Sequence, residues 1–194
     1  MKPKLFTTKN LVLTAVMAAL ASVLMFLEFP LPFMPPFLKF DFSDIPVFVA
    51  ALAVSPVAGV LAALIKNLLH LGASTTGGVG EIANFLITLF LVVPPAIIWR
   101  KYPKKLFFGF GIGILAMSLG AVVANYFFLI PFFATFTPMQ EIIAWCQSIN
   151  PAIHNTLTLV LYGIVPFNIV KGMIVCVLSY FVLLRLRKHK FGQN

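Results

Sequence analysis

The chain has 194 residues, of which 61% are hydrophobic and only 10% are charged, and its mean hydropathy is +1.03. A soluble domain of this length cannot hide so much apolar surface, because its outside must face water. The composition therefore excludes a soluble globular protein and indicates an all-α membrane protein that contacts lipid. The net charge of +9 does not indicate a nucleic-acid partner, because the basic residues lie at the ends of apolar segments.

Six apolar segments predict a bundle of six transmembrane helices within a single domain, residues 1–194, since a spanning helix needs about 20 mostly apolar residues. The segments cover residues 11–27, 43–54, 57–71, 81–99, 106–128 and 156–186. The first carries no small-residue cleavage site before Glu28, so we expect it to remain as a span. The second is short, with Ser43 or Asp44 placed to cap its first turn.

Proline residues mark the interruptions of these segments. Pro94-Pro95 is expected to kink or shorten the fourth segment, and Pro166 to kink or restart the sixth. Residues 72–80 form a polar, glycine-rich loop, and residues 140–149 are expected to form a surface helix in a longer connection.

Three groups of basic residues test the number of spans. They precede the first segment, separate the fourth from the fifth, and follow the sixth: Lys2, Lys4 and Lys9; Arg100, Lys101, Lys104 and Lys105; Arg185, Arg187, Lys188 and Lys190. Six spans place all three groups on one side of the membrane, which the positive-inside bias identifies as the cytoplasm. We therefore expect both termini to be cytoplasmic.

Polar residues at membrane depth are costly and usually mark a ligand or ion path. Asn168 and Lys171 are three residues apart in the sixth segment, so they share one helix face and can present an amide and an ammonium to a ligand. The alternative is that Lys171 reaches the membrane interface or forms a structural pair with Glu81.

Three further polar residues permit the same two interpretations. Glu81 and Asn84 share a face at the start of the fourth segment, where Glu81 can also complement the helix dipole. Asn125 lies deep in the fifth segment, where an asparagine also commonly bonds between helices. Convergence of these residues on one pocket would indicate a binding site for a small molecule.

The first loop and the first segment are also candidates. Leu38, Phe40 and Asp41 belong to an aromatic loop that either covers a ligand or forms a hydrophobic plug. In the first segment, Ala15 with Ala19 and Ala18 with Ser22 form two small-xxx-small steps, which permit close helix approach. The pattern alone favours internal packing over docking of a partner.

Catalytic and metal-binding chemistry is not indicated. His70 is interpreted as a hydrogen-bonded helix histidine rather than a metal ligand, because no second His or Cys has matching spacing. No catalytic triad and no paired carboxylates at depth are expected, and Asp41 and Asp44 are interpreted as capping residues. We therefore expect no enzymatic activity, no metal and no cofactor.

Four stretches of the sequence resemble a known family: residues 40–46 (FDFSDIP), 66–70 (KNLLH), 74–85 (STTGGVGEIANF) and 165–171 (VPFNIVK). They are similar to the substrate-binding S components of energy-coupling factor (ECF) vitamin transporters, most closely the riboflavin-specific type. The resemblance covers nearly the whole chain.

The resemblance implies a protein of six membrane helices that binds one vitamin near the extracellular side, with riboflavin as the transported ligand. The implied partners are a transmembrane coupling protein, which docks on the alanines of the first helix, and two cytoplasmic ATPase subunits. Ala15 and Ala19 match this docking pattern, with Ala18 and Ser22 as a weaker step. The first loop, from Phe37 to Asp44, is the implied gate, and Asn168 and Lys171 match the ligand-binding motif.

Other functions remain to be separated from this one. They are an S component for another vitamin, a self-sufficient secondary transporter that couples ions through Lys171 and Glu81, and a membrane enzyme with a lipid substrate. The missing inverted repeat disfavours the secondary transporter, and the missing catalytic residues disfavour the enzyme.

Overall fold

The computed structural model describes residues 7–30, 38–74 and 76–191, with side chains described as far as Leu186. Parts of the sequence predictions fall outside these residues. They are Lys2 and Lys4 of the first basic group, Phe37 of the expected gate, and the side chains of Arg187, Lys188 and Lys190.

The described residues are almost entirely helical, as the composition predicts. The α-helices are α1 Thr8–Phe26, α2 Asp44–Ala53, α3 Pro56–His70, α4 Val79–Lys101, α5 Leu106–Ala124, α6 Ile130–Phe133, α7 Met139–Ile149, α8 Thr156–Leu159 and α9 Val165–Phe191. Short 3₁₀ turns, η1 Leu71–Ala73 and η2 Pro103–Lys105, follow α3 and α4. Two short strands, β1 Phe29–Pro30 and β2 Lys39–Phe40, pair antiparallel between α1 and α2, with Phe29 opposite Phe40.

Five helical segments of the described residues are long and apolar enough to cross a membrane: Thr8–Phe26, Pro56–Ala73, Val79–Lys101, Pro103–Phe133 and Thr156–Leu186. The second predicted span, residues 43–54, is present as α2, but this helix has only 10 residues. Such a helix is about 15 Å long, roughly half of the hydrocarbon thickness of a bilayer. The described residues therefore include five helical segments that are long enough to cross a membrane and one short apolar helix.

The prolines interrupt the helices less than the sequence predicts. The helix α4 continues through Pro94 and Pro95, so the expectation that they shorten it is wrong. Pro131 and Pro166 each follow a π-helical turn, η3 Asn125–Leu129 and η4 Val160–Ile164. Because proline lacks the N–H that an α-helix needs, the wider turn accommodates the break and the helix continues.

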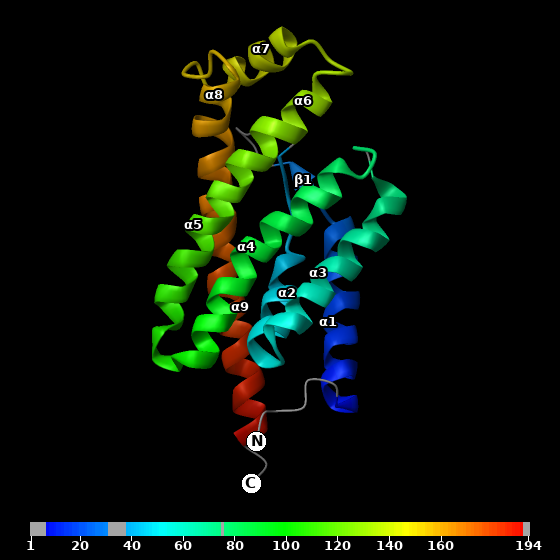
Figure 1. Ribbon diagram of the computed structural model, residues 1–194, viewed down its shortest axis with the longest axis vertical. Helices are drawn as coiled ribbons and strands as arrows, with labels where there is room; N and C mark the ends of the chain where they lie inside the picture. The colour runs from blue at the N-terminus through cyan, green and yellow to red at the C-terminus, as the bar shows by residue number, and fades with distance from the viewer. Residues whose placement is uncertain (1–6, 31–37, 75, 192–194) are drawn as a thin grey trace.

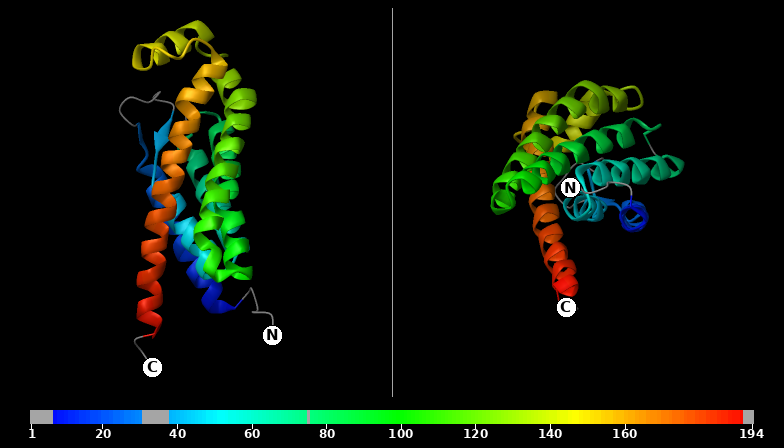
Figure 2. Two further views of the ribbon diagram at one scale, coloured as in Figure 1. Left: turned by 90° about the vertical axis from the view of Figure 1, so that its left-hand side faces the viewer. Right: turned by 60° about the horizontal axis from the view of Figure 1, so that its bottom comes forward.

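The long helices pack as a bundle (Figures 1 and 2). The beginning of α1, the α4–α5 connection and the end of α9 lie at one end of the bundle. These segments carry the described members of the three basic groups, among them Lys9, Lys104 and Arg185. At the opposite end, α7 lies across the ends of the long helices as a separate amphipathic helix. This helix matches the expected surface helix, and it buries Ile142 and Cys146 against the bundle.

The core lies between α2 and the helices that surround it. Residues Val47 to Leu52 of α2 are all buried, and they pack against α3, α9 and α1. The close contact of α4 with α5 depends on Gly113, where a Cβ atom would lie 2.4 Å from the carbonyl oxygen of Leu91. The outward faces of the long helices carry exposed apolar side chains such as Phe107, Leu115 and Phe127, as expected for contact with lipid.

Candidate ligand-binding site

A cavity of about 410 Å³ lies next to the N-terminal end of α2, whose first residue, Asp44, lines it. Its walls come from the ends of α1 and α3, the segment before α2, the start of α4, the end of α5, and α9. All but one of the predicted ligand-binding residues line it: Leu38, Asp41, Glu81, Asn84, Asn125, Asn168 and Lys171. The exception, Phe40, is buried and packs edge-on against Phe167, which does line the cavity.

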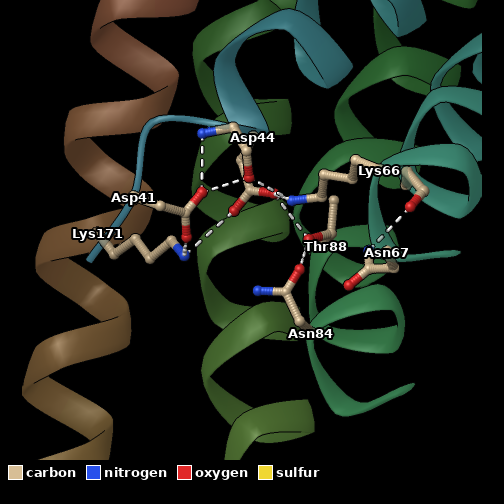
Figure 3. A network of polar contacts seen from close by, with 9 residues as sticks. Asp41, Asp44, Lys66, Asn67, Asn84, Thr88 and Lys171 are labelled. Carbon is tan, nitrogen blue, oxygen red and sulfur yellow. Dashed lines mark hydrogen bonds and ion pairs between the residues drawn. The ribbon is translucent and has the colours of Figure 1, made fainter. Parts of the chain in front are cut away.

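A network of four buried charges lies at one side of the cavity, and three of them, Asp41, Asp44 and Lys171, line it (Figure 3). The ammonium of Lys171 donates to Asp41 Oδ2 at 2.8 Å and lies 3.6 Å from Asp44 Oδ2. From the opposite side, Lys66 donates to Asp44 Oδ1 at 2.6 Å. Two carboxylates and two ammonium groups therefore balance one another inside the apolar bundle, as buried charges require.

Hydroxyl groups complete the hydrogen bonding of this network. Thr88 on α4 donates to Asp44 Oδ1 at 2.7 Å. Ser43 donates both its backbone N–H and its hydroxyl to Asp41 Oδ1, and its hydroxyl accepts from Lys66 at 2.6 Å. The ammonium groups of Lys171 and Lys66 and these hydroxyl donors together compensate the two buried carboxylates.

The second polar cluster lies where α3 ends and α4 begins. Glu81 Oε1 lies 2.9 Å from Nδ1 of His70, and Glu81 Oε2 accepts hydrogen bonds from Ser74 at 2.8 Å and Thr76 at 3.2 Å. The turn between the helices passes through Gly78, whose φ of +91° suits glycine. The structural pairing of Lys171 with Glu81, considered from the sequence, is therefore not found, whereas His70 is a hydrogen-bonded histidine as predicted.

The two deep asparagines are held by their own helices. Asn125 donates its amide to the carbonyl of Ala121, and Asn168 donates to that of Ile164, each at 2.8 Å. Asn125 is the first residue of the π-helical turn η3, Asn168 follows the turn η4 in α9, and both line the cavity. The hydrogen bonds described for them are within one helix, not between helices.

The small residues of α1 divide between two faces. Ala15 and Ala19 are exposed on the outside of the bundle. Ala18 and Ser22 are buried, and Ser22 donates to the carbonyl of Ala18. The two small-residue steps thus lie on different faces of α1: Ala15 with Ala19 faces outward, and Ala18 with Ser22 faces the interior.

The expectation that paired carboxylates are absent at depth is also wrong. Asp41 and Asp44 form such a pair, and sequence reasoning missed Asp44, Lys66 and Thr88 as members of the network. The available signal was a second lysine, Lys66, within an apolar segment, which requires a buried acidic partner. Among the described residues, no group of three or more His, Cys, Asp or Glu side chains is arranged to hold a metal ion.

Comparison with known proteins decides the family. Residues 9–183 match the family described as ECF transporter, substrate-specific component. The chain belongs to this family. Its S components are transport subunits rather than enzymes, and the chain is accordingly a multi-pass protein of the cell membrane.

Individual relatives agree with this assignment. The chain is 36% identical to the riboflavin transporter RibU of Staphylococcus aureus (strain TCH60), over 94% of this chain and 92% of the relative. It is 32% identical to the riboflavin transporter FmnP of Bacillus subtilis (strain 168), over 92% of each chain. A solved S component of a bacterial ECF transporter superimposes with a TM-score of 0.75 at 32% identity, covering 96% of this chain and 98% of that one.

Proposed function

We propose that this S component captures extracellular riboflavin and delivers it for ATP-driven uptake across the plasma membrane of a prokaryote. The observation that carries the proposal is the cavity, in which Asn84, Asn125, Asn168 and Lys171 meet from three helices. The identity of the ligand follows from the relatives, which are named as riboflavin transporters.

The cavity suits a flavin in both size and chemistry. Its volume of about 410 Å³ falls in the range of small-molecule sites. The isoalloxazine ring is flat and largely apolar, and Leu38, Ile87 and Phe167 supply apolar walls. The ring carbonyls and nitrogens accept hydrogen bonds from groups such as the Lys171 ammonium, and the ribityl hydroxyls can bond to asparagine amides and to Glu81.

The proposed topology has six membrane crossings with both termini in the cytoplasm. The short helix α2 is extended toward the opposite end of the bundle by the segment from Leu38 to Ser43, which completes the crossing. Non-helical backbone at this depth is permitted where it lines a cavity, as Leu38 and Asp41 do. The shared end of the basic groups then faces the cytoplasm by the positive-inside bias.

The proposed partners are a transmembrane coupling protein and two cytoplasmic ATPase subunits. Ala15 and Ala19 present a small-residue face on the outside of α1, which allows close approach of a partner helix. The protein supplies binding, and its partners supply ATP hydrolysis; the S component itself moves the ligand by tilting in the membrane.

A binding titration tests the ligand. The protein purified alone in detergent is titrated with riboflavin, and quenching of flavin fluorescence reports binding. Thiamine and biotin serve as control vitamins, and saturable binding is expected for riboflavin alone. Binding of a different vitamin would contradict the substrate but keep the S-component function, whereas ion-driven uptake by the isolated chain would support a secondary transporter instead.

A second experiment tests the docking surface. Replacing Ala15 and Ala19 with Leu adds bulk to the exposed face of α1, so ATP-dependent uptake is expected to be lost while riboflavin binding stays within about twofold of wild type. Ala152→Leu, in the exposed α7–α8 connection away from this step, provides a control for added volume. Full uptake by the double variant would show that this face does not dock the partner.

A further inference from the structure

Lys66 is the most deeply buried charge of the network, yet it does not line the cavity. Its side chain is 0% exposed, whereas Asp41, Asp44 and Lys171 all reach the cavity wall. Lys66 enters from α3, on the far side of Asp44 from Lys171 (Figure 3). A residue in this position cannot touch a ligand in the cavity, but it can act on one through Asp44 and Lys171.

The geometry divides the two carboxylates between the two lysines. Asp44 is bonded to Lys66 at 2.6 Å and lies farther from Lys171, at 3.6 Å. Asp41 is bonded to Lys171 at 2.8 Å. Lys66 therefore satisfies most of the charge of Asp44, and Lys171 has a single close carboxylate.

This division matters because a lysine ammonium has three N–H donors. With one donor on Asp41 and only a distant contact to Asp44, Lys171 retains donor capacity toward the cavity. If Lys66 were absent, the unpaired Asp44 would attract the Lys171 ammonium strongly in this low-dielectric interior. Lys171 would then bridge the two carboxylates and lose donor capacity for a ligand.

We propose that Lys66 is a positioning residue for ligand binding. From behind the cavity wall it neutralises the charge of Asp44, which leaves the Lys171 ammonium free to donate to the bound vitamin. This inference rests on the proposed function and extends it from residues that face the cavity to one that does not. The affinity for the ligand then depends on the charge balance of the pair Asp44–Lys66, not on direct contact between the ligand and Lys66.

A charge-balance experiment tests this proposal by riboflavin titration of purified variants. Lys66→Met keeps the volume of the chain but leaves Asp44 unpaired, and we expect affinity to fall about tenfold or more. Asp44→Asn leaves Lys66 unpaired beside the Lys171 charge, and we expect a similar fall. The double variant Asp44→Asn with Lys66→Met restores neutrality, and we expect its affinity to return to within about threefold of wild type.

Recovery in the double variant distinguishes positioning from simple structural support. A purely structural lysine would leave the double variant binding at least as weakly as either single variant, and that result would overturn the proposal. Wild-type affinity in Lys66→Met would overturn it as well. Lys104→Met, which removes an exposed cation from the α4–α5 connection, is the matched control and is expected to bind like wild type.

The design remains decisive if a single variant does not fold. Melting temperature in detergent reports folding for each variant, and the charge-neutral double variant is then compared directly with wild type. Near-wild-type affinity supports the proposal and a large loss contradicts it. Failure of the wild-type protein itself to bind riboflavin would contradict the proposed function, which separates that failure from failure of this inference.

Discussion

The two polar clusters at the cavity are built in different ways. The cluster of Glu81, His70, Ser74 and Thr76 joins residues within a stretch of 12 positions, across one helix–turn–helix connection. The cluster of Asp41, Asp44, Lys66 and Lys171 joins residues up to 130 positions apart, from segments that meet only in the folded bundle. The first can form as soon as α3 and α4 pack, whereas the second requires the complete fold.

The two clusters also differ in the charges that they contain. The Glu81 carboxylate is surrounded by hydroxyl groups, which carry no charge, and by one imidazole. The other cluster consists of four full charges, and removing one leaves its partner buried and uncompensated. We therefore expect changes in the four-charge network to have larger effects than changes around Glu81.

The largest effect is expected for Lys171→Ala. The substitution removes a donor to the ligand and leaves Asp41 without its closest cation, so we expect riboflavin affinity to fall about 100-fold or more. Fluorescence titration measures the change, with Lys104→Ala as an exposed control. An affinity within about twofold of wild type would make Lys171 a structural residue and place the ligand elsewhere.

A smaller effect is expected for Glu81→Gln. The amide keeps the shape of the carboxylate but replaces one acceptor oxygen with a donor, which cannot accept from Ser74 and Thr76. We expect riboflavin affinity to fall about threefold in the same titration. A loss as large as that of Lys171→Ala would show that the two clusters contribute equally and would contradict the comparison.

The smallest effect is expected for Thr88→Val, which is nearly isosteric. It removes one hydrogen bond to Asp44, whose charge remains balanced by Lys66, so we expect the free energy of unfolding to fall by about 1 kcal/mol. Thermal or denaturant unfolding in detergent measures this change. Thr135→Val provides the control, because the exposed Thr135 hydroxyl donates to the backbone carbonyl of Phe132. A fall in the free energy of unfolding as large as that of Lys66→Met would mean that the hydroxyl groups, rather than the charges, stabilise the network.

The sequence predicts the helices well, because apolar length and basic flanks are local signals. It also predicts that Asn168 and Lys171 share a face, because a spacing of three residues determines this in any helix. It does not reveal that Lys171 pairs with Asp41, since no local pattern links two residues 130 positions apart. Asp44 was misinterpreted for a related reason: an acidic residue at a helix start has a sufficient local explanation as a cap.

The face that a small residue occupies is likewise set by tertiary packing. Ala15 and Ala18 belong to overlapping steps of the same pattern, yet one is exposed and the other is buried against the bundle. The pattern predicts that backbones can approach closely along α1, but it carries no information on which neighbour approaches.

The short length of α2, about half that of a membrane-spanning helix, affects the space that is available to a ligand. A full-length helix in its place would add about 15 Å of cylinder roughly 10 Å wide, and the chain fills that region instead with a thin extended segment from Leu38 to Ser43. The cavity of about 410 Å³ lies beside this segment, which lines it with Leu38 and Asp41. A ligand bound there adds packing contacts to the surrounding helices, so ligand binding is expected to stabilise the bundle as well as to load the transporter.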